Sequence, residues 1–405
     1  MLRLTRIVAL ISALVATLGT AALASSATFA QGMRGMTAAQ EDEQEDRQDT
    51  SSNRRSGAVF AMTNETAGNM IVVYRRRNDG TLRRIRSVRT RGLGIGVDTD
   101  TQGALRLSND NRFLYAVNPG SDDLTVFAVN GTNLKLVQKI NAGDQPLSLT
   151  LSGNLLYVLN GSVAGNGIRG FRVANDGTLT ELPDSFRALS SPIAVPGIVE
   201  FSPDGNVILV THKTTNVLLS PQNAIDAFTI GADGYASAMP IRNATFGLRP
   251  FSLAFRNDGK LVVVESFNAA PNLSAASSYQ LKPDGTLEVI SGSIPNGQTD
   301  VCWVVITNDQ RYAFTANFGS GTISSYRFDS SGDLSLINGS AASLGETSQP
   351  VDLSLSADGR FLFLLLRGTG GVAAFRIGEG GSLTSLGVVV GGLPVADGAS
   401  GLAAY

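Results

Sequence analysis

The chain repeats one pattern of hydrophobic and polar positions seven times. Each unit has a hydrophobic strand, a polar turn of the Asp-Gly type, a second hydrophobic strand, a Gly-rich loop and an aromatic third strand. The residues that end the second strands lie about 42 to 54 positions apart: Asn64, Asn118, Asn160, His212, Ser266, Asn317 and Leu366. Such a period in strand-rich sequence is typical of propeller blades. The pattern therefore predicts an all-β fold, a seven-bladed β-propeller of four-stranded blades over residues 58–405.

The two ends of this repeat array complement each other. The first unit begins directly with its second strand, AVFAMTN, whereas the last residues, Gly398 to Tyr405, have the pattern of an additional innermost strand. A propeller whose first and last blades are not joined would leave exposed sheet edges. We therefore expect the C-terminal strand to join blade 1 and close the ring.

The innermost strand of each blade alternates between large apolar residues and a more polar set. Because successive side chains of a strand point to opposite faces, the apolar set is expected between blades and the other set in the central channel. The predicted channel set is Ala104 and Arg106, Ser148 and Thr150, Ile198 and Glu200, Ser252 and Ala254, Trp303 and Val305, and Asp352 and Ser354.

One face of the ring is predicted to bind the ligand. The variable loops, including 213–223 and 268–276, all connect second strands to third strands, so they lie on one face. Gln145, Arg249, Asp300 and Gln349 immediately precede innermost strands and belong to that face too. Loops on a rigid scaffold are the usual carriers of binding residues.

The N-terminus has the composition of an export signal. Arg3 and Arg6 precede an apolar run, and small residues follow it, so residues 1–30 are predicted to be a signal peptide and the protein to be secreted or extracytoplasmic. The apolar run is shorter than the ~20 residues of a membrane-spanning helix, so no stable membrane insertion is expected. Residues 31–57 are polar and acidic and are predicted to be a disordered tail.

Net charge and cysteine content restrict the kinds of partner and of cross-link that the protein can have. The formal net charge is −2, which argues against nucleic acid as a partner because duplex binding normally needs a basic face. The single cysteine, Cys302, excludes an intramolecular disulfide framework. We expect a monomer whose partner is a small molecule, or an extracellular protein or glycan.

The repeat also resembles a known family. The blade motifs FSPDGNVILVTH and LSADGRFLFLLL, each followed by an aromatic strand, are similar to those of the lactonase-type seven-bladed propellers, which include 6-phosphogluconolactonase and 3-carboxy-cis,cis-muconate lactonising enzyme. The resemblance covers all but the first ~57 residues. It implies a lactonase-type hydrolase that acts on a small polar, sugar-derived lactone. Members of that family often carry Pro-His pairs at the start of the innermost strand, and none of the matching pairs here contains His.

Three channel residues are the catalytic candidates. Glu200 is suited to act as a general base on water, and Arg106 or Arg249 to stabilise the oxyanion that develops on a lactone carbonyl. Asp352 is the second channel carboxylate. The alternative for all three is a solvated set of paired charges without catalytic function.

The candidate substrate-binding residues are Arg249, His212, Trp303 and Asp300. For His212, which stands where other blades have Asn, a structural role in capping the following turn is the favoured interpretation. No metal site and no cofactor are predicted, because the channel offers only two carboxylates. A non-catalytic extracellular binding or scaffold propeller is the alternative function.

Overall fold

The computed structural model describes residues 57–163, 165–213 and 223–405. The predicted signal peptide and the predicted tail up to residue 56 lie outside the described residues. Gly57 already belongs to the first strand. None of the helices in the described ranges is long and apolar enough to span a bilayer.

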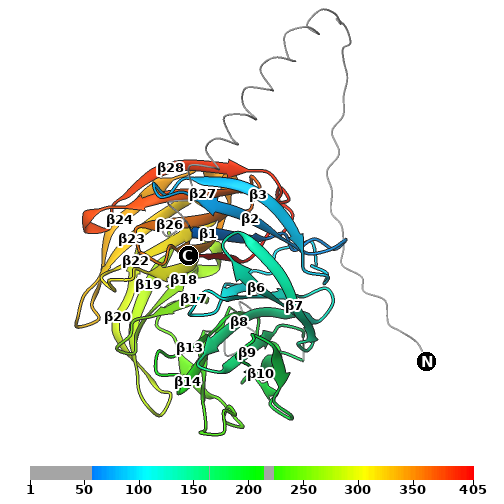
Figure 1. Ribbon diagram of the computed structural model, residues 1–405. Coiled ribbons are helices and arrows are strands. Elements are labelled where there is room, and N and C mark those ends of the chain that lie inside the picture. The colour runs from blue at the N-terminus through cyan, green and yellow to red at the C-terminus, as the bar shows by residue number, and fades with distance from the viewer. Residues whose placement is uncertain (1–56, 164, 214–222) are drawn as a thin grey trace, which may run out of the picture. The chain divides into compact units, whose positions relative to one another are not determined.

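The described strands form seven antiparallel sheets arranged as the blades of a ring (Figure 1). Blade 1 contains β29 (Leu402–Ala404), β1 (Gly57–Met62), β2 (Met70–Arg76) and β3 (Leu82–Arg89). Blade 2 contains β4 (Leu105–Leu107), β5 (Phe113–Asn118), β6 (Asp123–Asn130) and β7 (Asn133–Asn141). Blade 3 contains β8 (Pro146–Ser152), β9 (Leu155–Asn160), β10 (Gly167–Val173) and β11 (Leu179–Glu181), with β12 (Arg187–Ala188) also paired to β10.

The other four blades have the same order from the inside outward. Blade 4 contains β13 (Pro196–Phe201), β14 (Val207–His212), β15 (Ala224–Thr229) and β16 (Ile241–Ala244). Blade 5 contains β17 (Pro250–Phe255), β18 (Lys260–Glu265), β19 (Ala275–Leu281) and β20 (Leu287–Pro295). Blade 6 contains β21 (Val301–Ile306), β22 (Tyr312–Asn317), β23 (Thr322–Phe328) and β24 (Leu334–Ser343). Blade 7 contains β25 (Pro350–Leu355), β26 (Phe361–Leu366), β27 (Gly371–Ile377) and β28 (Leu383–Val390). Within the described residues, three single-turn 3₁₀ helices lie in connections: η2 (Phe267–Ala269), η3 (Glu346–Ser348) and η4 (Glu379–Gly381).

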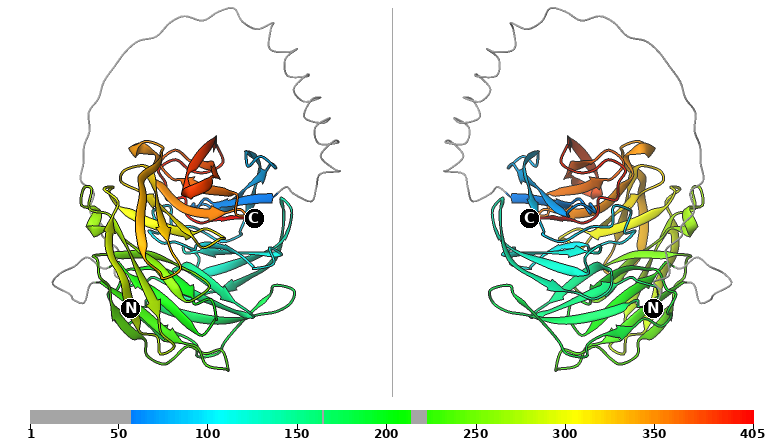
Figure 2. Two further views of the ribbon diagram at one scale, coloured as in Figure 1. Left: turned by 90° about the vertical axis from the view of Figure 1, so that its left-hand side faces the viewer. Right: turned by 90° about the vertical axis from the view of Figure 1, so that its right-hand side faces the viewer.

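The ring is closed as the sequence predicted. β29 pairs with β1 in antiparallel register, with Phe60 opposite Ala403. Figure 2 shows the end of the chain beside the blue strands of blade 1 from two opposite sides. Asn64 Nδ2 adds a bond to the carbonyl of Gly398 at 3.0 Å. The first and last strands of the repeat array therefore share one sheet, which removes the open edge that each would otherwise have.

The turns after the innermost strands follow directly from local sequence. In the turn after β13, Ser202 Oγ donates to Asp204 Oδ1 at 2.6 Å, and the same oxygen accepts the N–H of Asn206 at 3.1 Å. Gly205 has φ of +74°, which an L residue adopts only with strain. These bonds hold the short hairpin, and the same arrangement recurs after β25 at Ser356 and Asp358.

Candidate functional site

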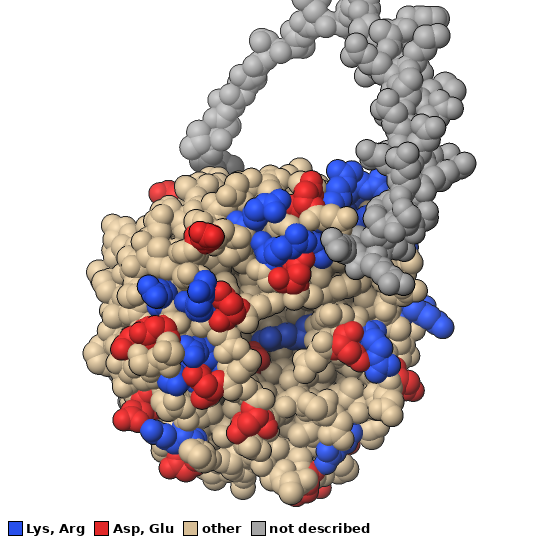
Figure 3. Space-filling model, turned by 60° about the vertical axis from the view of Figure 1, so that its left-hand side comes forward, with Lys and Arg blue, Asp and Glu red and all other residues tan. Residues whose placement is uncertain are grey.

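A cavity of about 490 Å³ lies in the middle of the ring and is lined mainly by the innermost strands. Its wall includes Asn109, Ser152, Pro203 and Asn257, which belong to the turns and strand ends that follow these strands. Figure 3 shows the hollow in the middle of the ring, with acidic and basic side chains visible inside it. The cavity therefore opens on the face that bears the Asp-Gly turns. The sequence predicted that a ligand binds on the opposite face, which bears the variable loops, and that remains a prediction.

Arg106 and Glu200 form an ion pair inside this cavity. Nη2 of Arg106, from β4, contacts Oε2 of Glu200, from β13, and Thr150 Oγ1 lies 3.4 Å from Oε1 of the same carboxylate. The side chains are 30% and 21% exposed, so both remain within reach of a ligand. Burial raises the pKa of Glu200, and Arg106 partly offsets that rise. A carboxylate of raised pKa beside a guanidinium is a suitable arrangement for general base catalysis with charge stabilisation.

Asp352 lines the same cavity at its inner end. It lies near the start of β25 and is 3% exposed. Its Oδ2 accepts the N–H of Gly401 at 2.7 Å, and the carboxylate also accepts the N–H of Gly103. Burial raises the pKa of Asp352 to about 7, in spite of these two bonds. Because the pKa of Asp352 lies near neutrality in the folded protein, this side chain can gain or lose a proton near neutral pH.

Asp352 is expected to make the stability of the protein depend on pH. Its pKa is higher in the folded than in the unfolded chain, so its stabilising effect is complete below about pH 4 and is lost as pH rises to about 7. Over that interval each pH unit lowers the free energy of unfolding by up to ~1.4 kcal/mol. Urea unfolding at pH 5 and pH 8 measures this effect. Between these two pH values, the free energy of unfolding should fall less for Asp352→Asn than for the parent protein. Any weakening of the N–H bonds from Gly103 and Gly401 in the variant adds a cost that does not vary with pH. Parallel pH profiles of variant and parent would contradict the assignment.

The inner end of the cavity is closed by the connection between β3 and β4. This connection runs from residue 90 to residue 104, whereas β7 and β8 are joined by residues 142–145 alone. Its segment 98–104, called the plug below, crosses the channel. Gln102 donates its N–H to Gly197 in blade 4, and its side chain exchanges two bonds with the backbone of Val304 in blade 6. Leu149 of blade 3 donates to the carbonyl of Gly103.

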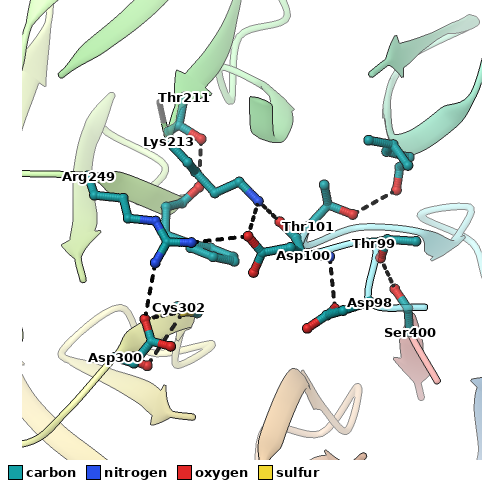
Figure 4. A network of polar contacts seen from close by, with 12 residues as sticks. Asp98, Thr99, Asp100, Thr101, Thr211, Lys213, Arg249, Asp300, Cys302 and Ser400 are labelled. Carbon is teal, nitrogen blue, oxygen red and sulfur yellow. Dashed lines mark hydrogen bonds and ion pairs between the residues drawn. The ribbon is translucent and has the colours of Figure 1, made fainter. Parts of the chain in front are cut away.

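A charged network holds the plug from the other side, as Figure 4 shows. Asp100 Oδ2 lies 2.7 Å from Lys213 Nζ and 3.2 Å from Arg249 Nη2, and Arg249 Nη1 lies 3.5 Å from Asp300 Oδ1. Burial by itself would raise the pKa of Asp100, but Lys213 and Arg249 outweigh burial and lower it. Asp98 pairs with Arg367 in the same region. Arg249 and Asp300, two predicted substrate-binding residues, are therefore brought together, but on the opposite side of the plug from Arg106.

The other two predicted binding residues are enclosed by protein. His212 is fully buried, and its Nε2 lies 2.9 Å from Asp226 Oδ2 inside blade 4. This contact joins β14 to β15, and the expected cap on the following turn is not among the contacts of His212 in the described residues. Trp303 is 2% exposed, packs against Phe251 at 5.0 Å between ring centroids, and donates its indole N–H to the carbonyl of Thr101 at 3.2 Å. The plug therefore covers Trp303 in this structure.

Five residues of the plug network were not among the residues predicted from the sequence: Asp98, Asp100, Gln102, Lys213 and Arg367. The available signal was the length of the connection between blades 1 and 2, which contains two aspartates among glycines and threonines. Among the described residues no group of three or more His, Cys, Asp or Glu side chains is placed to hold a metal ion.

Solved structures of similar shape share the fold at low sequence identity. The periplasmic gluconolactonase of Pseudomonas aeruginosa is 19% identical with a TM-score of 0.67, over 86% of this chain and 98% of that chain. A protein of Bacteroides uniformis provisionally named a 6-phosphogluconolactonase is 19% identical with a TM-score of 0.66, over 87% of this chain and 100% of that chain. A Bacteroides fragilis protein of the same provisional name is 18% identical with a TM-score of 0.64, over 87% and 98% of the two chains. At these identities the likeness shows the fold alone.

A comparison with curated proteins finds no match. The family model described as lactonase, seven-bladed β-propeller, matches residues 51–196 and 266–345, together more than half of the chain. Those ranges contain Arg106 but neither Glu200 nor Asp352, so the match does not depend on the two cavity carboxylates. The sequence motifs, the seven sheets and this match agree: the chain belongs to the lactonase family of seven-bladed β-propellers.

Proposed function

We propose that this protein binds a small polar, sugar-derived lactone in the central cavity and hydrolyses it. The observation that carries the proposal is the convergence of Arg106, Glu200 and Asp352 on one solvent-open cavity of about 490 Å³. This volume suits a small-molecule ligand. Membership of the lactonase family, and the gluconolactonase named among the similar structures, support a lactone as the ligand.

The three side chains can divide the reaction between them. Glu200 takes a proton from water as the water oxygen bonds to the lactone carbonyl carbon, and Arg106 stabilises the negative charge on the carbonyl oxygen. The bond to the ring oxygen then breaks, and Asp352 supplies the proton that the leaving oxygen needs. The product is an open-chain hydroxy acid. A pKa of about 7 lets Asp352 donate at neutral pH and recover its proton afterwards.

A panel of lactones tests this proposal. Purified protein should release acid from aldonolactones at a rate well above spontaneous hydrolysis, followed at constant pH by titration. Simple aliphatic lactones, which lack hydroxyl groups, serve as the comparison. The proposal of hydrolysis is wrong if no lactone in the panel is opened faster than in buffer.

A non-catalytic binding propeller is the second candidate, and one observation favours it. The only histidine of the chain, His212, is buried in blade 4, so no imidazole reaches the cavity. Ligand binding measured by calorimetry without any turnover would support this alternative.

We also propose that the protein is exported, because residues 1–30 have the charge and hydrophobic pattern of a signal peptide. The intact mass of material from the extracytoplasmic fraction should then lack about 24 to 30 N-terminal residues. Full-length protein confined to the cytosol would contradict export.

A further inference from the structure

The charges around the central cavity are few and already paired. Of the described residues that line it, three ionise: Arg106, Glu200 and Asp352. Arg106 is the single cation and contacts Glu200 directly. The cavity therefore carries no net positive charge, and it becomes negative whenever Asp352 loses its proton.

At the cavity floor, the two backbone N–H groups that converge among the described residues are already bonded. Two N–H groups converge there, those of Gly103 and Gly401, and both donate to the carboxylate of Asp352. Phosphate groups in proteins are normally held by backbone N–H groups or by Arg and Lys side chains. A phosphate placed at this floor would lie next to a carboxylate instead.

The groove beside the cavity is also lined by polar groups and paired charges. A groove of about 510 Å³ between blades 4 and 5 shares Ser202, Pro203 and Asn257 with the cavity wall. Its ionisable residues are Asp204, Asp258 and Lys282. Lys282 Nζ lies 2.5 Å from Glu288 Oε2, and Asp258 Oδ2 lies within 2.9 Å of both Arg256 and Lys260. A long substituent that reached this groove would again meet polar groups and paired charges.

We infer that the cavity selects uncharged polyhydroxy lactones and discriminates against the same lactones when they carry a phosphate. A phosphate has a charge of about −1.5 to −2 at neutral pH. Transferring it from water next to Glu200 and Asp352, with no unpaired cation, is unfavourable. Hydroxyl groups, in contrast, find acceptors and donors in Asn257, Ser152 and Ser354 along the wall. This inference rests on the proposed lactone site.

The test uses lactams, which have the shape of the lactones but are not hydrolysed. Calorimetry would compare glucono-1,5-lactam with its 6-phosphate on the purified protein. We expect the neutral lactam to bind at least about tenfold more tightly at low salt, with a smaller difference at high salt because the repulsion is screened. Equal affinities, tighter binding of the phosphate, or binding of neither lactam would overturn the inference. Lactam binding without lactone hydrolysis would instead contradict the proposed activity and leave the ligand class standing.

A matched pair of variants tests the location of the effect. Asn257 and Asn308 are both exposed and occupy the same position in the turns after β17 and β21, but only Asn257 borders the cavity. Asn257→Lys should tighten binding of the phosphorylated lactam roughly fivefold, because it adds a cation to a cavity wall that has no unpaired one among the described lining residues. Asn308→Lys should leave that affinity unchanged. An equal gain from both variants would mean that the cavity does not set the discrimination.

Discussion

Deleting residues 398–405 is expected to unfold the protein or to destabilise it by on the order of 5 kcal/mol or more, which is comparable with the whole stability of a domain. The deletion removes the ladder between β29 and β1 and uncovers β1, whose six residues are all buried. It also removes the Gly401 N–H bond to Asp352 and the bond from Asn64 to Gly398. Thermal unfolding and light scattering of the truncated protein measure the effect.

Tyr405→Phe is the control for this deletion. It keeps β29 and removes only the bond from Tyr405 Oη to the carbonyl of Gly131, which is exposed and 2.9 Å long. The expected cost is below ~1 kcal/mol. If the truncated protein melted at the temperature of the parent, closure of the ring by the C-terminal strand would not be what stabilises it.

Glu200→Gln is expected to abolish lactone hydrolysis while shifting the melting temperature by only a few degrees. The amide cannot accept the proton of water, so the base of the proposed reaction is lost. The side chain is partly exposed to the cavity, and Gln can still accept a hydrogen bond from Arg106, so the fold loses little. Steady-state kinetics at constant pH, together with calorimetric melting, measure the two effects separately.

Phe201→Asp, at the neighbouring position of β13, is expected to destabilise the fold strongly, unlike Glu200→Gln. Phe201 is 5% exposed and packs edge-on against Tyr157 with ring centroids 5.9 Å apart. An aspartate there would be an unpaired charge in the space between blades, at a cost of several kcal/mol, roughly 4 or more. A stable Phe201→Asp protein together with an unfolded Glu200→Gln protein would mean that the two faces of β13 are assigned the wrong way round.

The sequence by itself determined the fold because the repeat consists of patterns among residues that are close together in the chain. Strand alternation and Asp-Gly turns each depend on residues within one blade. Their recurrence seven times, with a period of about 50 residues, predicts a propeller. Closure of the ring followed from a missing first strand and an additional last one. Alternation along β4, β13 and β25 also gave the common direction of Arg106, Glu200 and Asp352, because the pleat of a strand depends on nothing outside it.

The tertiary structure decided where the plug crosses the channel and which of the described channel side chains it covers. The path of the plug depends on bonds to blades that are distant in sequence, such as those from Gln102 to Gly197 and Val304. No local pattern encodes these contacts, so the plug could not be foreseen. It covers Trp303 and separates Arg249 and Asp300 from Arg106. The burial of His212 against Asp226 was likewise decided by packing within blade 4, since the identity of a residue does not reveal its exposure.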